Sequence, residues 1–164
     1  MKNEITGMRL RLIVMNFLQF AVWGAYLTSM GTYLFNIGLG AKIGLFYAMQ
    51  GIVSLFMPAI MGIIADRWVP AQKLYGFCHF MAAVFMVAAG WYGYVDGEAV
   101  NFGTLFTFYS LSVAFYMPTL ALTNSVAYTA LDKVKLDPVI AFPPIRIFGT
   151  IGFICSMLLT DILG

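Results

Sequence analysis

Five stretches of this chain stay apolar and almost free of charge for about 20 residues each, the length that crosses about 30 Å of hydrocarbon as an α-helix. They cover residues 12–33, 43–65, 74–95, 104–128 and 139–159. The chain is 62% hydrophobic and only 10% charged, whereas a soluble domain is about 45–50% apolar. Strands of a membrane barrel would alternate over about ten residues instead. The sequence predicts an all-α, polytopic membrane helix bundle with five transmembrane helices.

The basic side chains are distributed unevenly between the two ends of these predicted spans. Lysine and arginine collect in cytoplasmic loops of membrane proteins. Most basic side chains lie on one side of the up-and-down path, namely Lys2, Arg9, Arg11, Arg67, Lys73, Lys133 and Lys135. Only Lys42 lies on the other side. We therefore expect a cytoplasmic amino terminus and an integral membrane location, surrounded by lipid.

The first apolar stretch follows a basic start, as a secretory signal does. Its length, its internal Asn16, Gln19 and Trp23, and the absence of a small-residue cleavage pattern favour a retained helix. Cys78 and Cys155 both fall inside predicted helices. We expect buried, inert thiols there, with neither a disulfide framework nor a metal site.

The predicted helices are joined by short connections, so residues 1–164 form one transmembrane unit in which consecutive helices are antiparallel neighbours. Many transporters are assembled from repeats of three helices in two six-helix halves. Five helices therefore suggest an incomplete six-helix lobe. We expect the chain to be the amino-terminal lobe of a longer protein whose carboxy-terminal lobe is absent.

Polar and aromatic side chains form a stripe along four of the helices when they are projected at 100° per residue. The stripes contain Gln19, Trp23, Tyr26, Met30 and Tyr33; Tyr47, Gln50, Ser54, Met57 and Met61; Ser112, Tyr116, Thr119 and Thr123; and Arg146, Thr150, Phe153 and Met157. Gly149 and Gly152 lie beside the last stripe, where they would let a neighbouring backbone approach. Each stripe by itself is compatible with hydrogen bonding between helices. Together they resemble the lining of a site for a polar, ring-bearing solute.

Arg146 is the only charged side chain inside any of the five stretches. Placing such a group in hydrocarbon costs roughly 3 kcal/mol or more, so it usually faces a protein interior or a wet cavity. Pro143 and Pro144 precede it and either open the fifth helix or break it near its cytoplasmic end. Arg146 is therefore a candidate binding residue, and the alternative is that its side chain extends to the cytoplasmic interface.

A short charged motif follows the second predicted helix. Gly62 lies shortly before the pair Asp66 and Arg67, and Lys73 comes seven residues after Asp66. This arrangement resembles the loop motif of the major facilitator superfamily, although the second glycine of that motif is missing. The alternative is an ordinary interfacial charge pair.

Several further motifs occur in the order found in one family. They are Phe17-Leu-Gln-Phe20 with Trp23-Gly24, Phe56-Met-Pro-Ala59, Cys78-His79, Tyr116-Met-Pro-Thr-Leu120, and Phe142-Pro-Pro-Ile-Arg-Ile147 with Gly149-Thr-Ile-Gly-Phe153. Nearly the whole chain resembles the amino-terminal part of the bacterial nucleoside:proton symporters of the major facilitator superfamily. The block around Arg146 is the most specific of these motifs.

This resemblance implies secondary active transport: proton-coupled nucleoside uptake across the bacterial cytoplasmic (inner) membrane by alternating access. It implies substrate-binding roles for Arg146, Thr150 and Phe153. Helical projection adds four residues to the cavity, namely Gln19, Trp23, Tyr116 and Thr119. The resemblance also implies gating roles for three residues, namely Gly62, Asp66 and Arg67.

Proton coupling is left open, because no Asp or Glu lies inside any predicted span. Coupling uses carboxylates of the absent lobe, uses His79, or does not occur in this fragment. We favour a packed or interfacial His79.

The expected partners are the nucleoside, membrane lipid and the missing lobe, without nucleic acid. The proton is the coupling ion, and no other cofactor and no metal is expected. Enzyme activity is not expected, because nothing pairs a nucleophile with a base. The alternative function is a structural or regulatory membrane subunit whose polar stripes only hold helices together.

Overall fold

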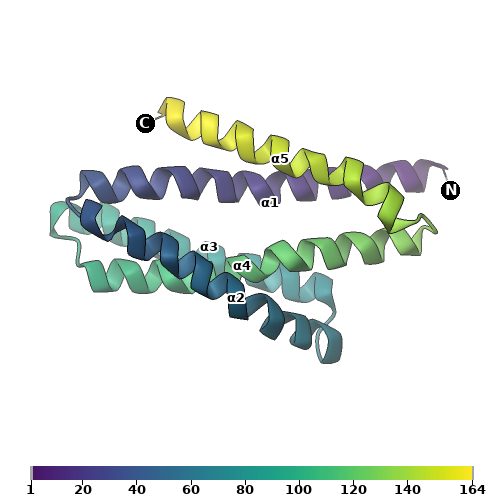
Figure 1. Ribbon diagram of the computed structural model, residues 1–164, viewed down its shortest axis with the longest axis horizontal. Coiled ribbons are helices and arrows are strands. Elements are labelled where there is room, and N and C mark those ends of the chain that lie inside the picture. The colour runs from purple at the N-terminus through teal and green to yellow at the C-terminus, as the bar shows by residue number, and fades with distance from the viewer. Residues whose placement is uncertain (1, 164) are drawn as a thin grey trace. The chain divides into compact units, whose positions relative to one another are not determined.

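The computed structural model describes residues 2–163, with the side chains of all of these except residues 2, 3 and 98. This part of the chain contains five α-helices and two short 3₁₀ helices (Figure 1). They are α1 (Lys2–Asn36), η1 (Gly40–Lys42), α2 (Ile43–Arg67), α3 (Ala71–Asp96), η2 (Gly97–Ala99), α4 (Phe102–Lys133) and α5 (Pro138–Leu163). Each predicted span lies inside one α-helix, and the helices extend beyond the spans. The all-helical fold predicted from the sequence is therefore confirmed.

All five α-helices are long and apolar enough to cross a membrane. Large apolar side chains cover their outer faces, and Leu55, Val87 and Ile162 are 71%, 69% and 79% exposed. A soluble protein rarely exposes apolar surface on this scale. The chain is therefore an integral membrane protein whose outer surface is suited to contact with lipid.

The chain divides into two compact units, whose boundaries fall inside α1 and α4. The first unit contains α1 up to Met30, α4 from Thr123, and all of α5. The second unit, from Gly31 to Leu122, contains the end of α1, all of α2 and α3, and most of α4.

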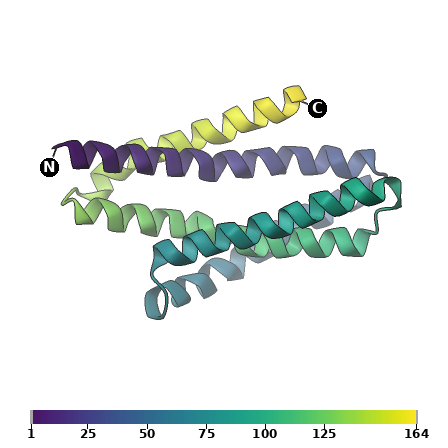
Figure 2. The ribbon, with the colours of Figure 1, turned by 180° about the vertical axis from the view of Figure 1, so that it is seen from behind.

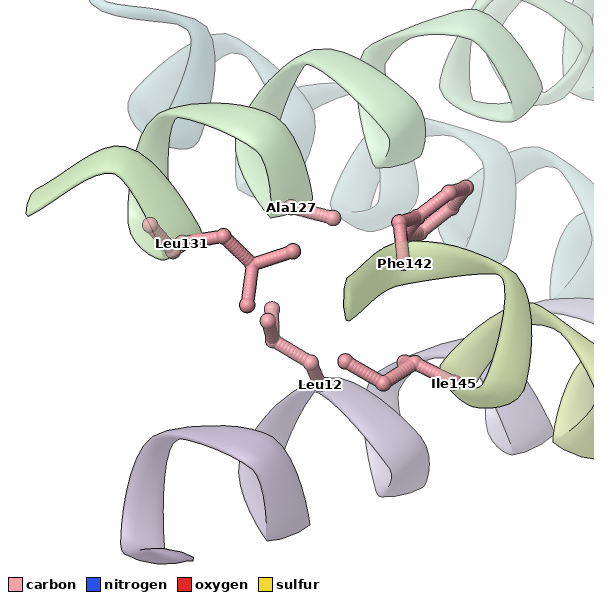
Figure 3. Packing of buried hydrophobic residues seen from close by; sticks show 6 residues of the cluster. Leu12, Ala127, Leu131, Phe142 and Ile145 are labelled. Carbon is pink, nitrogen blue, oxygen red and sulfur yellow. The ribbon is translucent and has the colours of Figure 1, made fainter. Parts of the chain in front are cut away.

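The core of the first unit joins three helices. Leu12 of α1 packs with Ala127 and Leu131 of α4 and with Phe142 and Ile145 of α5 (Figure 3). All five side chains are at most 6% exposed. This cluster holds the first halves of α1 and α5 together and positions the part of α5 that carries Arg146.

The start of α5 follows from its first residues. Asp137 is the cap: its Oδ1 accepts a hydrogen bond from the backbone N–H of Val139 at 2.9 Å. Pro138 takes the first helical position, where a missing N–H costs nothing. Pro143 and Pro144 lie inside the helix. The expectation that these two prolines open or break the helix was therefore wrong, because the cap and Pro138 start the helix earlier and it continues through them.

The second unit has its own core, formed by Met61 of α2, Leu74 and Cys78 of α3 and Leu122 of α4. A short turn joins α2 to α3, and Figure 2 shows it from behind. In this turn the backbone N–H groups of Trp68 and Val69 both donate to the carbonyl of Ile64, each at 3.0 Å. These bonds satisfy the carbonyl at the end of α2 and let the chain reverse within a few residues.

Candidate functional site

Helices α1 and α5 approach each other closely in the first unit because glycines face the opposing backbone. A Cβ added to Gly24 of α1 would lie 2.6 Å from the carbonyl oxygen of Phe153 of α5. A Cβ added to Gly152 of α5 would collide with the backbone of Phe17 on α1. Two helices can contact at this distance only where neither carries a side chain. The small-residue face predicted on the fifth helix is thus the face that packs against α1.

Arg146 lies at this helix contact, about two turns before the tightest approach at Gly152 and Phe153. Its guanidinium carbon lies 3.8 Å from the centre of the Phe20 ring. Its Nη1 atom lies only 2.8 Å from the position that a Cβ on Gly149 would take. Since Gly149 follows Arg146 along α5, the side chain turns away from the first turn of the helix. The side chain thus does not extend toward the start of α5, the end at which the sequence analysis expected the alternative contact with the interface.

Aromatic rings continue the site from Phe20 along α1 and across to α5. Trp23 lies one turn after Phe20, with ring centroids 6.2 Å apart. Trp23 also meets Phe153 edge-on at 5.7 Å, with an interplanar angle of 67°. The Trp23 Nε1 atom is buried without a hydrogen-bond partner in residues 2–163. A buried donor of this kind is a group that a bound polar molecule can satisfy.

The first unit contains five of the predicted site residues, and ring and cation contacts connect three of them, Arg146, Trp23 and Phe153, through Phe20. Arg146, Trp23 and Phe153 are half-buried, and Gln19 is only 2% exposed. Thr150 lies one turn after Arg146 on α5 and is exposed. The arrangement combines a cation, ring faces and an exposed hydroxyl, which are groups that suit a planar, hydroxyl-bearing solute.

Tyr116 and Thr119 belong to α4 in the second unit. Tyr116 is 3% exposed and Thr119 is fully buried. The Thr119 hydroxyl donates to the Tyr116 carbonyl at 2.6 Å, and the Tyr116 ring lies 5.9 Å from the ring of His79. His79 also meets Tyr75 edge-on at 4.5 Å. His79 is thus packed between two tyrosines, whereas the cavity roles of Tyr116 and Thr119 stay predictions.

Two polar side chains of the predicted stripes hold helices together inside the second unit. Gln50 of α2 donates from Nε2 to the hydroxyl of Tyr109 on α4 at 2.5 Å. Ser112 of α4 donates to the carbonyl of Ala82 on α3 at 2.7 Å. All of these groups are buried, and buried polar groups are normally paired. These two contacts agree with the interpretation that some polar stripes serve helix packing.

The predicted gating residues lie at the end of α2. Asp66 and Arg67 are exposed, and the side chain of neither forms an ion pair or hydrogen bond with any part of the chain that the structure describes. A Cβ on Gly62 would meet no atom within 4 Å. The gating roles of these three residues stay predictions, and Gly62 makes no close contact with another helix within residues 2–163.

The two cysteines differ in their exposure. Cys78 is buried, but Cys155 is exposed. The expectation of two buried thiols was therefore wrong for Cys155, because α5 turns Gly149 and Gly152 toward α1 and leaves Cys155 on its outer face. Residues 2–163 contain no group of three or more His, Cys, Asp or Glu side chains that could hold a metal ion.

Two buried residues of α1 near Trp23, namely Phe20 and Asn16, were not among the residues that the sequence predicted for the site. Asn16 is fully buried, and its Nδ2 donates to the Leu12 carbonyl at 2.9 Å. Its Oδ1 has no hydrogen-bond partner in the part of the chain that the structure describes. Both residues lie on α1 within two turns of Trp23, so their spacing could have placed them beside it. Only the contact with Arg146 distinguishes Phe20 from other lipid-compatible phenylalanines.

Comparison with known proteins finds a family model that covers almost the whole chain. The model described as "Nucleoside H+ symporter" matches residues 6–163. Xanthosine permease of Escherichia coli is 42% identical over 150 residues, which cover 90% of this chain and 34% of that protein. Nucleoside permease NupG of Escherichia coli is 39% identical over 161 residues, which cover 96% of this chain and 37% of that protein.

Solved structures agree with these sequence matches. The crystal structure of nucleoside transporter NupG superposes with a TM-score of 0.82 at 38% identity, covering 94% of this chain and 37% of that one. A mutant of NupG gives a TM-score of 0.85 at 39% identity. The chain thus spans little more than a third of the length of the relatives that it matches.

Proposed function

Because the chain belongs to the nucleoside H+ symporter family, we propose that it is the amino-terminal part of a secondary transporter that takes up nucleosides together with protons. The carboxy-terminal lobe of the same protein is then its main partner, as in the major facilitator superfamily. Transport proceeds by alternating access, in which two lobes rock around a site near the middle of the membrane. The protein acts as a carrier and not as an enzyme.

The observation that supports this proposal best is the cluster of Arg146, Phe20, Trp23 and Phe153 in the first unit. A nucleoside joins a planar base to a ribose with several hydroxyls. Trp23 and Phe153 offer ring surface to the base, while the N–H groups of Arg146 donate to oxygen atoms of the solute. Thr150, exposed one turn away, adds a hydroxyl that can donate or accept.

The other predicted residues complete the proposal. Substrate-binding roles are proposed as well for Gln19, Tyr116 and Thr119, whose amide and hydroxyls would satisfy polar edges of the solute. Asp66 and Arg67 act in gating by pairing with the carboxy-terminal lobe, against which Gly62 would pack. This role is supported by the position of both charges at an exposed helix end, where they have no partner in residues 2–163.

Proton coupling is assigned to the carboxy-terminal lobe. No Asp or Glu lies in the five apolar stretches, and arginine is always charged at neutral pH, so it cannot carry a proton. His79 is packed against Tyr75 and Tyr116 in the second unit, which suits a structural role. A carboxylate outside this chain is therefore the coupling group in this proposal.

The proposal places the protein in the bacterial cytoplasmic membrane with its amino terminus inside the cell. The support is the excess of lysine and arginine at one end of the helices. Arg9 and Arg11 near the start of α1, Arg67 at the end of α2 and Lys133 at the end of α4 all belong to this basic end.

Uptake of radiolabelled uridine by cells that express the full-length protein tests this function. Arg146→Ala should lower the ratio of Vmax to KM about tenfold to a hundredfold, because a hydrogen bond to a charged group contributes about 1.5–3 kcal/mol. Arg146→Lys should recover only part of this loss, because an ammonium lacks the planar set of donors. Lys133→Ala, which removes an exposed cation at the end of α4, is the matched control. Unchanged uptake by Arg146→Ala would remove Arg146 from the site.

A second candidate function is a structural or regulatory membrane subunit. It is favoured by the bonds from Gln50 to Tyr109 and from Ser112 to Ala82, in which polar side chains only join helices. The same assay separates the two functions. A full-length protein that reaches the membrane and takes up no nucleoside would favour the second one.

A further inference from the structure

The guanidinium of Arg146 is held by one aromatic face and by no carboxylate. Its central carbon lies 3.8 Å from the centre of the Phe20 ring. It forms no ion pair or hydrogen bond with any residue that the structure describes. A cation over a desolvated ring face is attracted by the quadrupole of the ring, and this attraction does not use the N–H groups. The five N–H donors at the edge of the guanidinium therefore stay available.

Gly149 makes this contact possible. A Cβ at this position would lie 2.7 Å from Cδ2 of Phe20 and 2.8 Å from Nη1 of Arg146. Real Cβ atoms do not approach other heavy atoms this closely, so any larger residue at position 149 would displace the ring, the cation or both. Glycine, ring and cation thus form one arrangement across α1 and α5, inside the first unit.

Other ways to fix an arginine at membrane depth would interfere with binding. A carboxylate partner would occupy the N–H edge in a bidentate pair. Without any partner, the long side chain would sample many rotamers, and ordering it on binding would weaken affinity. A ring on the face of the guanidinium restricts its orientation and leaves its edge free.

We propose that Phe20 is a positioning residue for the solute: it holds the Arg146 guanidinium by its face so that the N–H edge meets the bound molecule. Gly149 provides the space for this arrangement. The inference rests on the proposed function, because it assumes that Arg146 binds nucleoside. It gives Phe20 and Gly149 roles in solute binding, whereas the sequence analysis assigned Phe20 no role and Gly149 only a role in helix packing.

The test measures uridine binding and uptake by the full-length purified protein and its variants. Phe20→Leu should raise KM and Kd for uridine about tenfold, which corresponds to about 1.4 kcal/mol, and leave Vmax within about twofold of the wild type. Phe20→Tyr keeps the ring face and should keep the affinity. Gly149→Ala should weaken binding although both contacting groups remain. Phe17→Leu, one turn earlier on α1 and outside the ring contacts, is the matched control and should bind like the wild type.

A double-mutant cycle separates positioning from a general structural role. If Phe20 acts through Arg146, Phe20→Leu should have no further effect on Kd in the Arg146→Ala protein. Additive effects of the two substitutions, or wild-type affinity of Phe20→Leu, would overturn the inference and leave the proposed function intact. A wild-type protein that does not bind uridine would overturn both. If Phe20→Leu folds poorly, the affinities of Gly149→Ala and Phe20→Tyr for uridine are compared instead. The inference expects weaker binding by Gly149→Ala, and equal affinity of these two proteins would overturn it.

Discussion

The glycine contact between α1 and α5 supports a prediction whose size follows from the structure. Gly24→Ala places a Cβ 2.6 Å from the Phe153 carbonyl oxygen, whereas ordinary contact begins at 3.4 Å. The obstacle is backbone and cannot rotate away, so the helices must separate by about 0.8 Å at this point. Such a gap forfeits about a quarter to a half of the dispersion energy of the affected contacts. Overpacking of this kind costs about 1–3 kcal/mol, and we expect a loss of stability in that range.

The measurement is equilibrium unfolding of the purified full-length protein in mixed detergent micelles. Gly90→Ala in α3 is the matched control, because Gly90 is exposed and a Cβ there meets no atom within 4 Å. Alanine is favoured over glycine inside a helix by about 0.5–1 kcal/mol, so this control should be neutral or slightly stabilising. Gly24→Ala should therefore lower the free energy of unfolding, whereas Gly90→Ala should leave it unchanged or raise it slightly. Equal effects, or a Gly24→Ala protein as stable as the wild type, would refute the reasoning from the helix contact.

Two further predictions concern the cap of α5 and the polar contact in the second unit. Asp137→Ala removes the acceptor for the Val139 N–H and should destabilise the start of α5 by about 1 kcal/mol. Asp137→Asn keeps an acceptor oxygen and should retain most of that stability. The measurement is amide hydrogen exchange at the start of α5, which should be faster in Asp137→Ala. Gln50→Leu leaves the fully buried Tyr109 hydroxyl unpaired and should lower the free energy of unfolding by about 1–3 kcal/mol. Adding Tyr109→Phe should recover part of that loss, and no recovery would contradict the assigned bond.

Much of the fold could be predicted from the sequence because the membrane restricts the choice of structure. A long apolar stretch without charge has to satisfy its backbone internally, which a helix alone does within one segment. The face of α5 was also predictable, because Gly149 and Gly152 are the small residues of that helix on the side next to Arg146. The prolines were misjudged because the decisive residues were Asp137 and Pro138, which start the helix earlier.

The candidate site was only partly predictable. Periodicity placed Arg146, Thr150 and Phe153 on one face of a helix, but it says nothing about the direction of a long side chain. The contact of Arg146 with Phe20 depends on the crossing of two helices and on Gly149, and these are tertiary features. Helical projection placed both Gln50 and Tyr116 in polar stripes and did not distinguish between them. In the structure Gln50 is bonded to Tyr109, and Tyr116 packs against the ring of His79.

The reciprocal glycine contacts also limit how this protein can move. Gly24 touches the backbone of α5, and Gly152 touches the backbone of α1. Sliding either helix by one residue would drive a side chain into the opposite main chain. In the proposed transport cycle, these two helices should therefore move as a single rigid body that carries Arg146 and Phe20 with it. Any bending that the proposed cycle requires is then expected outside the contact between α1 and α5.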